Sequence, residues 1–289
     1  MEELIDDANE RLKLEETAAL LAIYAAIDAE FSRLLGRIYS QLQSGQLLLE
    51  GSDMRALELI APLGQADSDE LLKLFERLLS VSTTAGLTLA ADLSAPVVSS
   101  PVAVAIPAES VALEARRARG YLEQHGRSFT GTVTGLISGG FLAGIAANEI
   151  ADQLRQRLEV VKSRTEVLVR TESLKAFNSA GRSYYVQNNV QLVVYYATPD
   201  DRTCPYCAAQ AGRVFKTGAI TVPRHPQCRC VLAPYATNQY ESAAPYDRNR
   251  RNHRREVLSY ARDKGVQLNE GPAYFEQLSP VATRKDGQT

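Results

Sequence analysis

The sequence lacks the long apolar run that a membrane-spanning helix requires. Such a span needs about 18 consecutive apolar residues, and the nearest approach, residues 135–147, is shorter and rich in glycine. The first residues, Met1 to Asp7, also lack the basic and apolar regions of a secretory signal. We therefore expect a soluble chain without a membrane partner, in which disulfide bonds do not form.

Sequence signatures of common enzymes are also missing. The chain has no Gly-rich phosphate loop, no nucleophile elbow and no second set of metal-binding carboxylates. Its 289 residues are 45% hydrophobic and 23% charged, which is ordinary for a globular protein and sufficient for two modest domains. The net charge of −2 is unevenly distributed, because residues 201–289 hold 14 Lys and Arg against 8 Asp and Glu. This basic end predicts an acidic partner, either nucleic acid or a protein surface.

Soft metal ligands are few, but they are concentrated in one place. All four cysteines and one of the three histidines lie in the 27 residues from Cys204 to Cys230. The donors form two close groups, Cys204 with Cys207, and His225 with Cys228 and Cys230. Two such groups separated by a hairpin-length insert are typical of a tetrahedral zinc site. Because five donors compete for about four positions, the predicted site is closed and structural. Cys204, Cys207 and Cys230 are predicted ligands, while His225 and Cys228 compete for the fourth place.

Two other uses of these cysteines stay open. A thioredoxin-like redox pair should open a helix within a βαβ unit, whereas Cys204 and Cys207 follow a β-rich run and precede a Gly-containing hairpin. The cysteines could also serve as small core residues in a fold without metal.

Helical periodicity dominates the first two thirds of the chain. Apolar residues at helical spacing predict amphipathic helices over about 3–44, 52–62 and 68–85, which together form an N-terminal helical bundle in residues 1–93. Three prolines in residues 94–109 predict an extended linker or arm that lies against a surface. Helix is then predicted for about 109–123, with a break in the glycine-rich run 126–140, and again for about 141–158 and 160–181.

Short β segments are predicted only after these helices. They cover residues 184–186, 191–197, 213–215 and 229–232, which are rich in β-branched and aromatic residues. We therefore predict an α+β fold, mostly helical, with a small antiparallel β unit near the C-terminus that zinc clips together.

Four segments in order carry a resemblance to a known family. They are Arg170-Thr171-Glu172 with Asn178, the run from Tyr196 to Cys207, the hairpin from Gly212 to Phe215, and the run from Pro223 to Cys230. Together they resemble the phage Mu F-like minor head, or head morphogenesis, proteins of tailed bacteriophages. The resemblance covers about residues 110–235 and is strongest over 164–235.

The resemblance implies a low-copy structural protein of the virion. Such a protein is associated with the portal and the packaged DNA, and acts in procapsid assembly, in the host cytoplasm, and in DNA delivery. Arg170, Glu172, Asn178 and Asp201 match recurring polar positions of the family, and are expected to tie the central helix to the zinc unit. We predict no enzymatic activity. The alternative is a metal-dependent nuclease in which His225 is catalytic.

The C-terminal segment, residues 236–289, is predicted to be a basic tail. Five arginines lie within eight residues: Arg248, Arg250, Arg251, Arg254 and Arg255. They predict sequence-independent contact with DNA phosphates or with an acidic head protein, although the segment could also be the solvated start of a helix.

Overall fold

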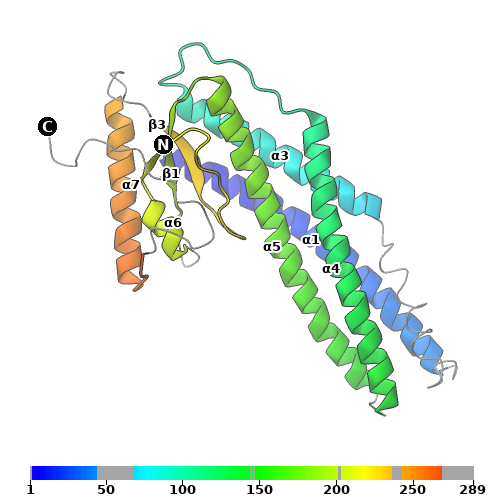
Figure 1. Ribbon diagram of the computed structural model, residues 1–289. Helices are drawn as coiled ribbons and strands as arrows, with labels where there is room; N and C mark the ends of the chain where they lie inside the picture. The colour runs from blue at the N-terminus through cyan, green and yellow to red at the C-terminus, as the bar shows by residue number, and fades with distance from the viewer. Residues whose placement is uncertain are drawn as a thin grey trace. The chain divides into compact units, whose positions relative to one another are not determined.

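The computed structural model describes residues 2–43, 68–143, 145, 147–200, 203–235 and 243–268. The helices are α1 (Glu2–Gln43), α3 (Ser68–Ser94), α4 (Ala108–Leu142), α5 (Ala147–Gln187), α6 (Pro205–Gln210) and α7 (Ala243–Asp263). The strands are β1 (Leu192–Tyr196), β2 (Val214–Lys216) and β3 (Val231–Tyr235), and all these elements are drawn in Figure 1. The predicted α+β class, mostly helical with a small antiparallel sheet near the C-terminus, is confirmed.

Two compact units are assembled from separate segments of the chain. The first unit combines Met1–Leu14, Leu79–Pro107 and Arg170–Thr289, and the second combines Glu15–Leu78 and Ala108–Val169. The helices α1, α3 and α5 each contribute to both units. The predicted domains 1–93 and 110–235 therefore each supply residues to both units.

The sheet lies in the first unit and has the strand order β2-β1-β3. Both pairs are antiparallel, with Val193 opposite Phe215 in β2 and opposite Pro234 in β3. Four of the five residues of β1 are buried, because a central strand is covered by side chains on both faces. The β-branched and aromatic sequence Leu-Val-Val-Tyr-Tyr suits this position.

The core of the first unit joins this sheet to five helices, α1, α3, α5, α6 and α7. Phe177 and Tyr185 of α5, Leu89 of α3 and Val257 of α7 are buried in the same apolar cluster as Tyr195. Because Val257 belongs to this cluster, α7 is part of the folded unit although it lies within the predicted tail.

The second unit is built from helices alone among the described residues. Its buried apolar side chains include Ile23 of α1, Phe75 of α3, Ala118 of α4 and Leu154 of α5. Near the end of α4, a Cβ on Gly140 would lie 2.7 Å from the side chain of Ile150. Glycine therefore permits the close approach of α4 and α5 at this point.

The strand predicted for residues 184–186 is wrong, because these residues form the last turns of α5. Tyr184 and Tyr185 are buried in the core, and the Tyr185 hydroxyl donates to the carbonyl of Leu232 at 3.0 Å. The helix ends at Gln187, and Asn189 just after it has a φ of 57°, the left-handed conformation common beyond helix C-termini. Tertiary packing therefore outweighs the β propensity of this short aromatic run.

The predicted break in residues 126–140 is also wrong, because α4 continues to Leu142. Each helical glycine costs about 1 kcal/mol relative to alanine, and buried side chains such as Val133 outweigh that cost. The helix predicted to end at about residue 85 likewise continues to Ser94, because Leu89 and Leu93 extend its buried face.

The proline-containing arm follows α3 and lies against the first unit, as predicted. The backbone N–H of Val102 donates to Asn188 Oδ1 at 2.7 Å, and its carbonyl accepts from Asn188 Nδ2 at 3.2 Å. Val98 and Val104 pack against the core of this unit.

Two predictions fall wholly or partly on residues outside the described ranges. The helix predicted for residues 52–62 lies outside them, as does Asp201. None of the described helices combines the length and the apolar character needed to span a membrane.

Candidate metal centre

The first pair of donors is positioned by the short helix α6. Cys204 is the N-cap residue of this helix, and its Sγ accepts the backbone N–H of Cys207 at 3.3 Å. Pro205 occupies the first turn, where its fixed φ suits a helix and no N–H is needed. The pair thus does open a helix, contrary to the expectation, but this helix lies between two antiparallel strands and not in a βαβ unit.

The second group of donors follows a tight turn before β3. The carbonyl of His225 accepts the N–H of Cys228 at 3.1 Å. Pro226 provides a fixed φ, and Gln227 takes the left-handed φ of 60°. A side chain tolerates that conformation only when its surroundings require it, and here the N–H of Gln227 donates to Thr171 Oγ1 of α5 at 3.2 Å. The turn is therefore fastened to the central helix.

The five predicted donors come together in space. Cys207 belongs to two groups, one with Cys204 and His225 and one with Cys228 and Cys230, and the ligand atoms within each group lie within 4.8 Å of one another. Zinc–sulfur bonds of about 2.3 Å at tetrahedral angles place neighbouring sulfurs about 3.8 Å apart. The observed separations are 4.0 Å between the sulfurs of Cys207 and Cys228, and 3.2 Å from Cys207 Sγ to His225 Nε2. This Cys/His cluster can therefore hold a metal ion.

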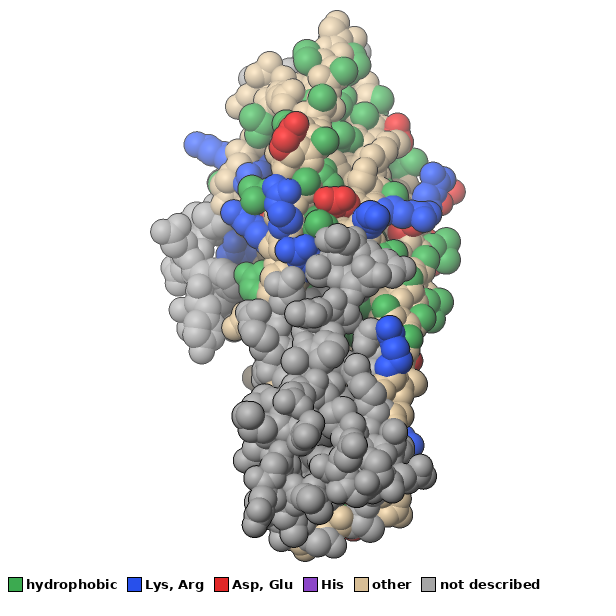
Figure 2. Space-filling model, turned by 90° about the vertical axis from the view of Figure 1, so that its right-hand side faces the viewer, with side chains coloured by type: hydrophobic (Ala, Val, Ile, Leu, Met, Phe, Trp, Pro, Cys, Tyr) green, Lys and Arg blue, Asp and Glu red, His purple; other side chains and the backbone are tan. Residues whose placement is uncertain are grey.

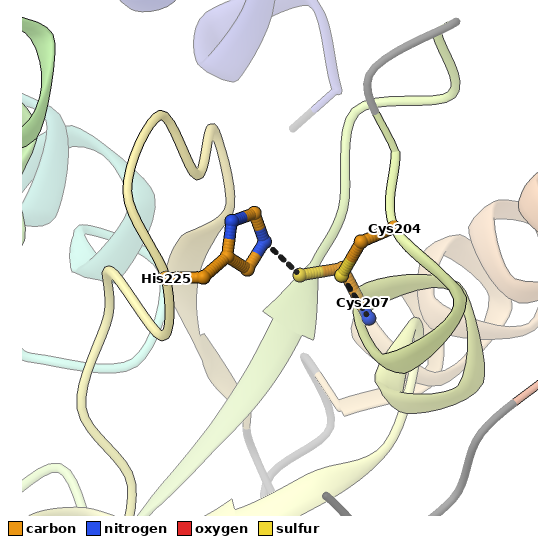
Figure 3. A group of neighbouring side chains, drawn as sticks. All are labelled: Cys204, Cys207 and His225. Carbon is orange, nitrogen blue, oxygen red and sulfur yellow. Dashed lines mark hydrogen bonds between the residues drawn. The ribbon is translucent and has the colours of Figure 1, made fainter. Parts of the chain in front are cut away.

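The orientation of His225 suits a metal ligand. Its Nδ1 lies 2.9 Å from the carbonyl oxygen of Pro226, which can only accept, so Nδ1 carries the proton. In the neutral imidazole, Nε2 is then the unprotonated atom that can bind a metal, and it points to Cys207 Sγ, with Cys204 beside it (Figure 3). Metal-binding histidines commonly use such a backbone carbonyl to fix their tautomer.

Protonation of the cluster depends on the hydrogen bonds within it. The hydrogen bond with Cys207 lowers the pKa of Cys204 to about 4, and the hydrogen bond with Cys204 raises the pKa of His225 to about 11. Hydrogen bonding to Cys207 also lowers the pKa of Cys228. Hydrogen bonding to Cys204 raises the pKa of Cys207, while burial raises that of Cys230. Because metal binds thiolates and neutral imidazole, binding must release protons from Cys207, Cys230 and His225.

A small cavity adjoins the cluster. Its volume is about 10 Å³, and it is lined by Thr198, Asp200, Thr203, Cys204, Cys207, His225, Arg229 and Cys230. Pockets for small molecules are usually some 300 Å³ or more. The cavity therefore suits an ion or a single water molecule and not a nucleotide.

Asn178 makes the tie between α5 and the metal unit that was expected of the polar residues. Its side chain is buried, with Nδ2 donating to the carbonyl of Cys230 at 3.2 Å and Oδ1 accepting the N–H of Leu232 at 3.3 Å. Glu172 is also buried, and it accepts from Lys175 of the same helix at 3.2 Å. Arg170 is half-buried, and its carbonyl accepts from Ser173.

Several residues around the cluster were not identified from the sequence. The Tyr195 hydroxyl lies 3.2 Å from Cys207 Sγ, and Thr171 holds the turn at Gln227. On the other side, Asp200 forms an ion pair with Arg229, and its backbone N–H donates to Thr203 Oγ1 at 3.0 Å. These last residues hold the segment that leads into Cys204. Thr171, Asp200, Thr203 and Arg229 lie in the segments that carry the family resemblance, but no role was assigned to them from the sequence.

The five predicted arginines of the basic segment lie on two different sides of α7, one packed against the protein and one exposed. Arg250 is buried, and donates to the carbonyl of Gly212 at 3.2 Å and to Asp247 at 2.8 Å. Arg254 donates to the carbonyl of Ala211 at 2.7 Å. These two arginines hold α7 against the end of α6 and cannot also face a partner. Arg248, Arg251 and Arg255 are exposed.

His253, between these arginines, is buried as well. Its Nε2 accepts the backbone N–H of Ala197 at 3.2 Å, and its ring packs on Tyr196 with 4.3 Å between centroids. Burial lowers the pKa of His253 to about 4. His253 is therefore a buried residue that adds no positive charge to the segment at neutral pH.

Comparison with known families gives one match. Residues 132–233 match the family described as Phage Mu protein F like protein, which confirms the resemblance predicted from the sequence. The matched segment is about a third of the chain, and contains the end of α4, α5, strands β1 and β2, the first residues of β3 and all five donors of the cluster. No curated protein and no solved structure matches the chain.

Proposed function

We propose that this protein is a structural minor head protein of a tailed phage, associated with the portal and the packaged DNA, and that it acts in procapsid assembly and DNA delivery. The proposal rests on one observation: the family match ends at residue 233, within β3, and includes every donor of the Cys/His cluster together with Asn178 and Thr171. The part of the chain that matches the family is thus a long helix joined to a small sheet, and to the turn before β3, by the hydrogen bonds of Asn178 and Thr171.

The metal in this cluster is proposed to be structural zinc. Thiolate and imidazole donors favour zinc over hard cations such as magnesium. With Cys207, Cys228 and Cys230 buried, and five donors available for four positions, the site leaves no open position for a reacting water. A three-stranded sheet of strands no longer than five residues has little core of its own. Metal binding would therefore supply much of its folding free energy.

The nuclease alternative requires His225 to face a substrate. Instead, its Nε2 lies 3.2 Å from Cys207 Sγ, its Nδ1 is bound to a carbonyl, and the adjoining cavity is about 10 Å³. We assign no catalytic role to His225 or to any other described residue.

The proposed partners are the portal protein and other head proteins, with sequence-independent contact to packaged DNA. The proposed location is the virion, in the head near the portal, with the host cytoplasm as the site of assembly. The family match supports the phage head, and the portal position is our extension of it.

Virion composition tests this proposal. The phage or induced prophage that encodes the chain should be compared with a deletion mutant, by mass spectrometry of gradient-purified procapsids and full heads. We expect the protein in both particles at low copy, and cross-linked to the portal. Its absence from both particles would refute the structural assignment, whatever its metal content.

A deletion strain complemented in trans separates fold from catalysis. The Cys207→Ser variant should lose metal, stability and incorporation together. The His225→Ala variant should lose function only in step with its metal or its stability. If it keeps both and still fails to support infection, His225 is catalytic and the nuclease alternative is correct.

A further inference from the structure

The exposed face of α7 carries four arginines, of which Arg251 forms an ion pair with Asp247 at 2.9 Å. At 100° per residue, positions 248, 251, 252, 255, 259 and 262 fall within about 100° of arc. These positions hold Arg248, Arg251, Asn252, Arg255, Ser259 and Arg262, and all six residues are exposed. We call these six residues the outer stripe. From Arg248 to Arg262 the stripe extends for about 21 Å along the helix.

The opposite face of α7 is packed against the protein. Tyr246, Arg250, His253, Val257 and Ala261 are buried, and they lie on the side of the helix opposite the outer stripe. This division shows that the stripe is not a partly folded tail. It is one side of a docked helix, whose orientation is set by its buried side.

The docking of α7 is specific. Arg254 donates to the carbonyls of Ala211 and Ala209, and Arg250 to that of Gly212, so both cap the carbonyl end of α6. A Cβ on Gly212 would lie 2.6 Å from Arg254 Cβ, which shows how closely the two segments approach. The helix α7 lies beside α6 in Figure 1. The helix that carries the outer stripe is therefore held in a fixed orientation against α6, the short helix whose N-cap residue is Cys204.

The chemistry of the stripe is unusual for this surface. It contains four arginines, an asparagine and a serine, with no acidic and no apolar side chain. The acidic residues of α7 lie at its margins: Asp247, which pairs with Arg250 and Arg251, and the exposed Glu256 and Asp263. On the face drawn in Figure 2, by contrast, basic, acidic and apolar side chains are interspersed.

We infer that the outer stripe binds the phosphate backbone of nucleic acid without reading its sequence. A duplex strand presents one phosphate for about every 3.4 Å of axis, so the stripe lies alongside about six phosphates in any register. Arginine donates to phosphate in a bidentate manner, which favours contact that is independent of base sequence. A protein partner would instead be expected to meet a buried aromatic or apolar anchor, and the stripe has none.

This inference deepens the proposed function, because a head protein of the proposed kind meets packaged DNA, but the test uses purified protein alone. Binding to labelled duplexes of about 30 base pairs, in two unrelated sequences, is measured by anisotropy across a salt series. Both duplexes should bind equally, and log K should fall linearly with log salt concentration. The quadruple variant R248S/R251S/R255S/R262S should lower the slope by about two to four units.

Matched variants make the result specific. The variant R116S/R117S/R155S/R157S removes the same charge from exposed positions of α4 and α5, and should keep the wild-type slope. Lysine at the four stripe positions should preserve most of the slope, because the contact is electrostatic. The double variant R250S/R254S should lower the melting temperature, whereas the outer quadruple variant should melt as the wild type does.

Two outcomes overturn the inference. If the α4 and α5 variant loses as much slope as the stripe variant, binding reflects net charge and not this face. If polyglutamate competes as well as DNA at equal charge concentration, the stripe recognises an acidic protein instead. Either outcome would remove the DNA contact proposed for this face, but not the proposed incorporation into the head, which virion composition tests separately.

Discussion

Replacing Asn178 by alanine is expected to destabilise the metal-bearing unit by about 3 kcal/mol. The side chain is buried and joins α5 to β3, accepting from the N–H of Leu232 and donating to the carbonyl of Cys230. Alanine leaves both backbone groups buried without this partner, and each such group costs about 1–3 kcal/mol. The two groups together would cost about 2–6 kcal/mol, and partial access of water to the space left behind keeps the sum in the lower half of that range.

The loss should appear in unfolding experiments on metal-loaded protein. Because the chain has no tryptophan, urea unfolding is followed by circular dichroism and not by indole fluorescence. The midpoint for the first unit should fall, and competition with a chelator should remove metal faster, because Asn178 also holds the backbone of Cys230. Ser179→Ala, at the exposed neighbouring position of α5, is the matched control and should change stability by less than about 0.5 kcal/mol.

The result that refutes this reasoning is simple. If Asn178→Ala and Ser179→Ala unfold at the same urea concentration, the hydrogen bonds of Asn178 do not hold the sheet to α5. The tie between the two would then lie in apolar packing alone.

Three further predictions concern the metal, the pH dependence and helix packing. Purified protein should contain about one zinc per chain by elemental analysis. Cys207→Ser should lower the zinc content to less than about half an equivalent, because Cys207 belongs to both donor groups. If the variant retains a full equivalent, the other four donors are sufficient to bind the metal. Burial lowers the pKa of His253 from 6.5 to about 4, so its contribution to stability is fully present above pH 6.5 and is lost as the pH falls toward 4, by up to about 3 kcal/mol. The test compares metal-loaded wild type with His253→Gln between about pH 7.5 and 5, the range in which histidine titrates. The unfolding midpoint of His253→Gln should fall less steeply with decreasing pH than that of wild type. If both midpoints fall equally steeply, the low pKa assigned to His253 is wrong. A Cβ on Gly86 would lie 2.1 Å from the carbonyl oxygen of Phe177, whereas one on Gly120 meets nothing within 4 Å. Gly86→Ala should therefore destabilise the protein by about 1–3 kcal/mol, and Gly120→Ala should stabilise it by up to about 1 kcal/mol. If both substitutions shift the melting temperature in the same direction, helix propensity and not packing determines their effect.

The cluster of metal donors could be predicted from the sequence because its geometry is local. Cys204 and Cys207 lie at the first turn of a short helix, and a second tight turn begins at His225 and ends at Cys228, two residues before Cys230. Close spacing brings such donors together with little help from the rest of the fold. For the same reason, the periodicity of α1 and the β-branched run of β1 predicted their structure correctly.

The surroundings of the cluster were less predictable because they depend on contacts between distant segments. Nothing local to Thr171 or Asn178 shows that they bind backbone groups more than 50 positions away. The sequence indicated that Asn178 is a structural tie through a family resemblance. Only the structure shows that it bonds to Cys230 and Leu232.

The sequence by itself determined which residues could bind a metal, that the fold is mostly helical, and that positive charge gathers near the C-terminus. Tertiary structure decided that residues 184–186 are helical, that α4 continues through its glycines, and which arginines of α7 are structural. The physical reason is the same in each case. Local propensities differ by only about 1 kcal/mol per residue, so burial against a distant surface decides both the type of element and the face that remains in solvent. Arg250 and Arg251 are neighbours in the sequence, yet one caps the end of α6 and the other lies on the outer stripe, because α7 presents only one side to the protein.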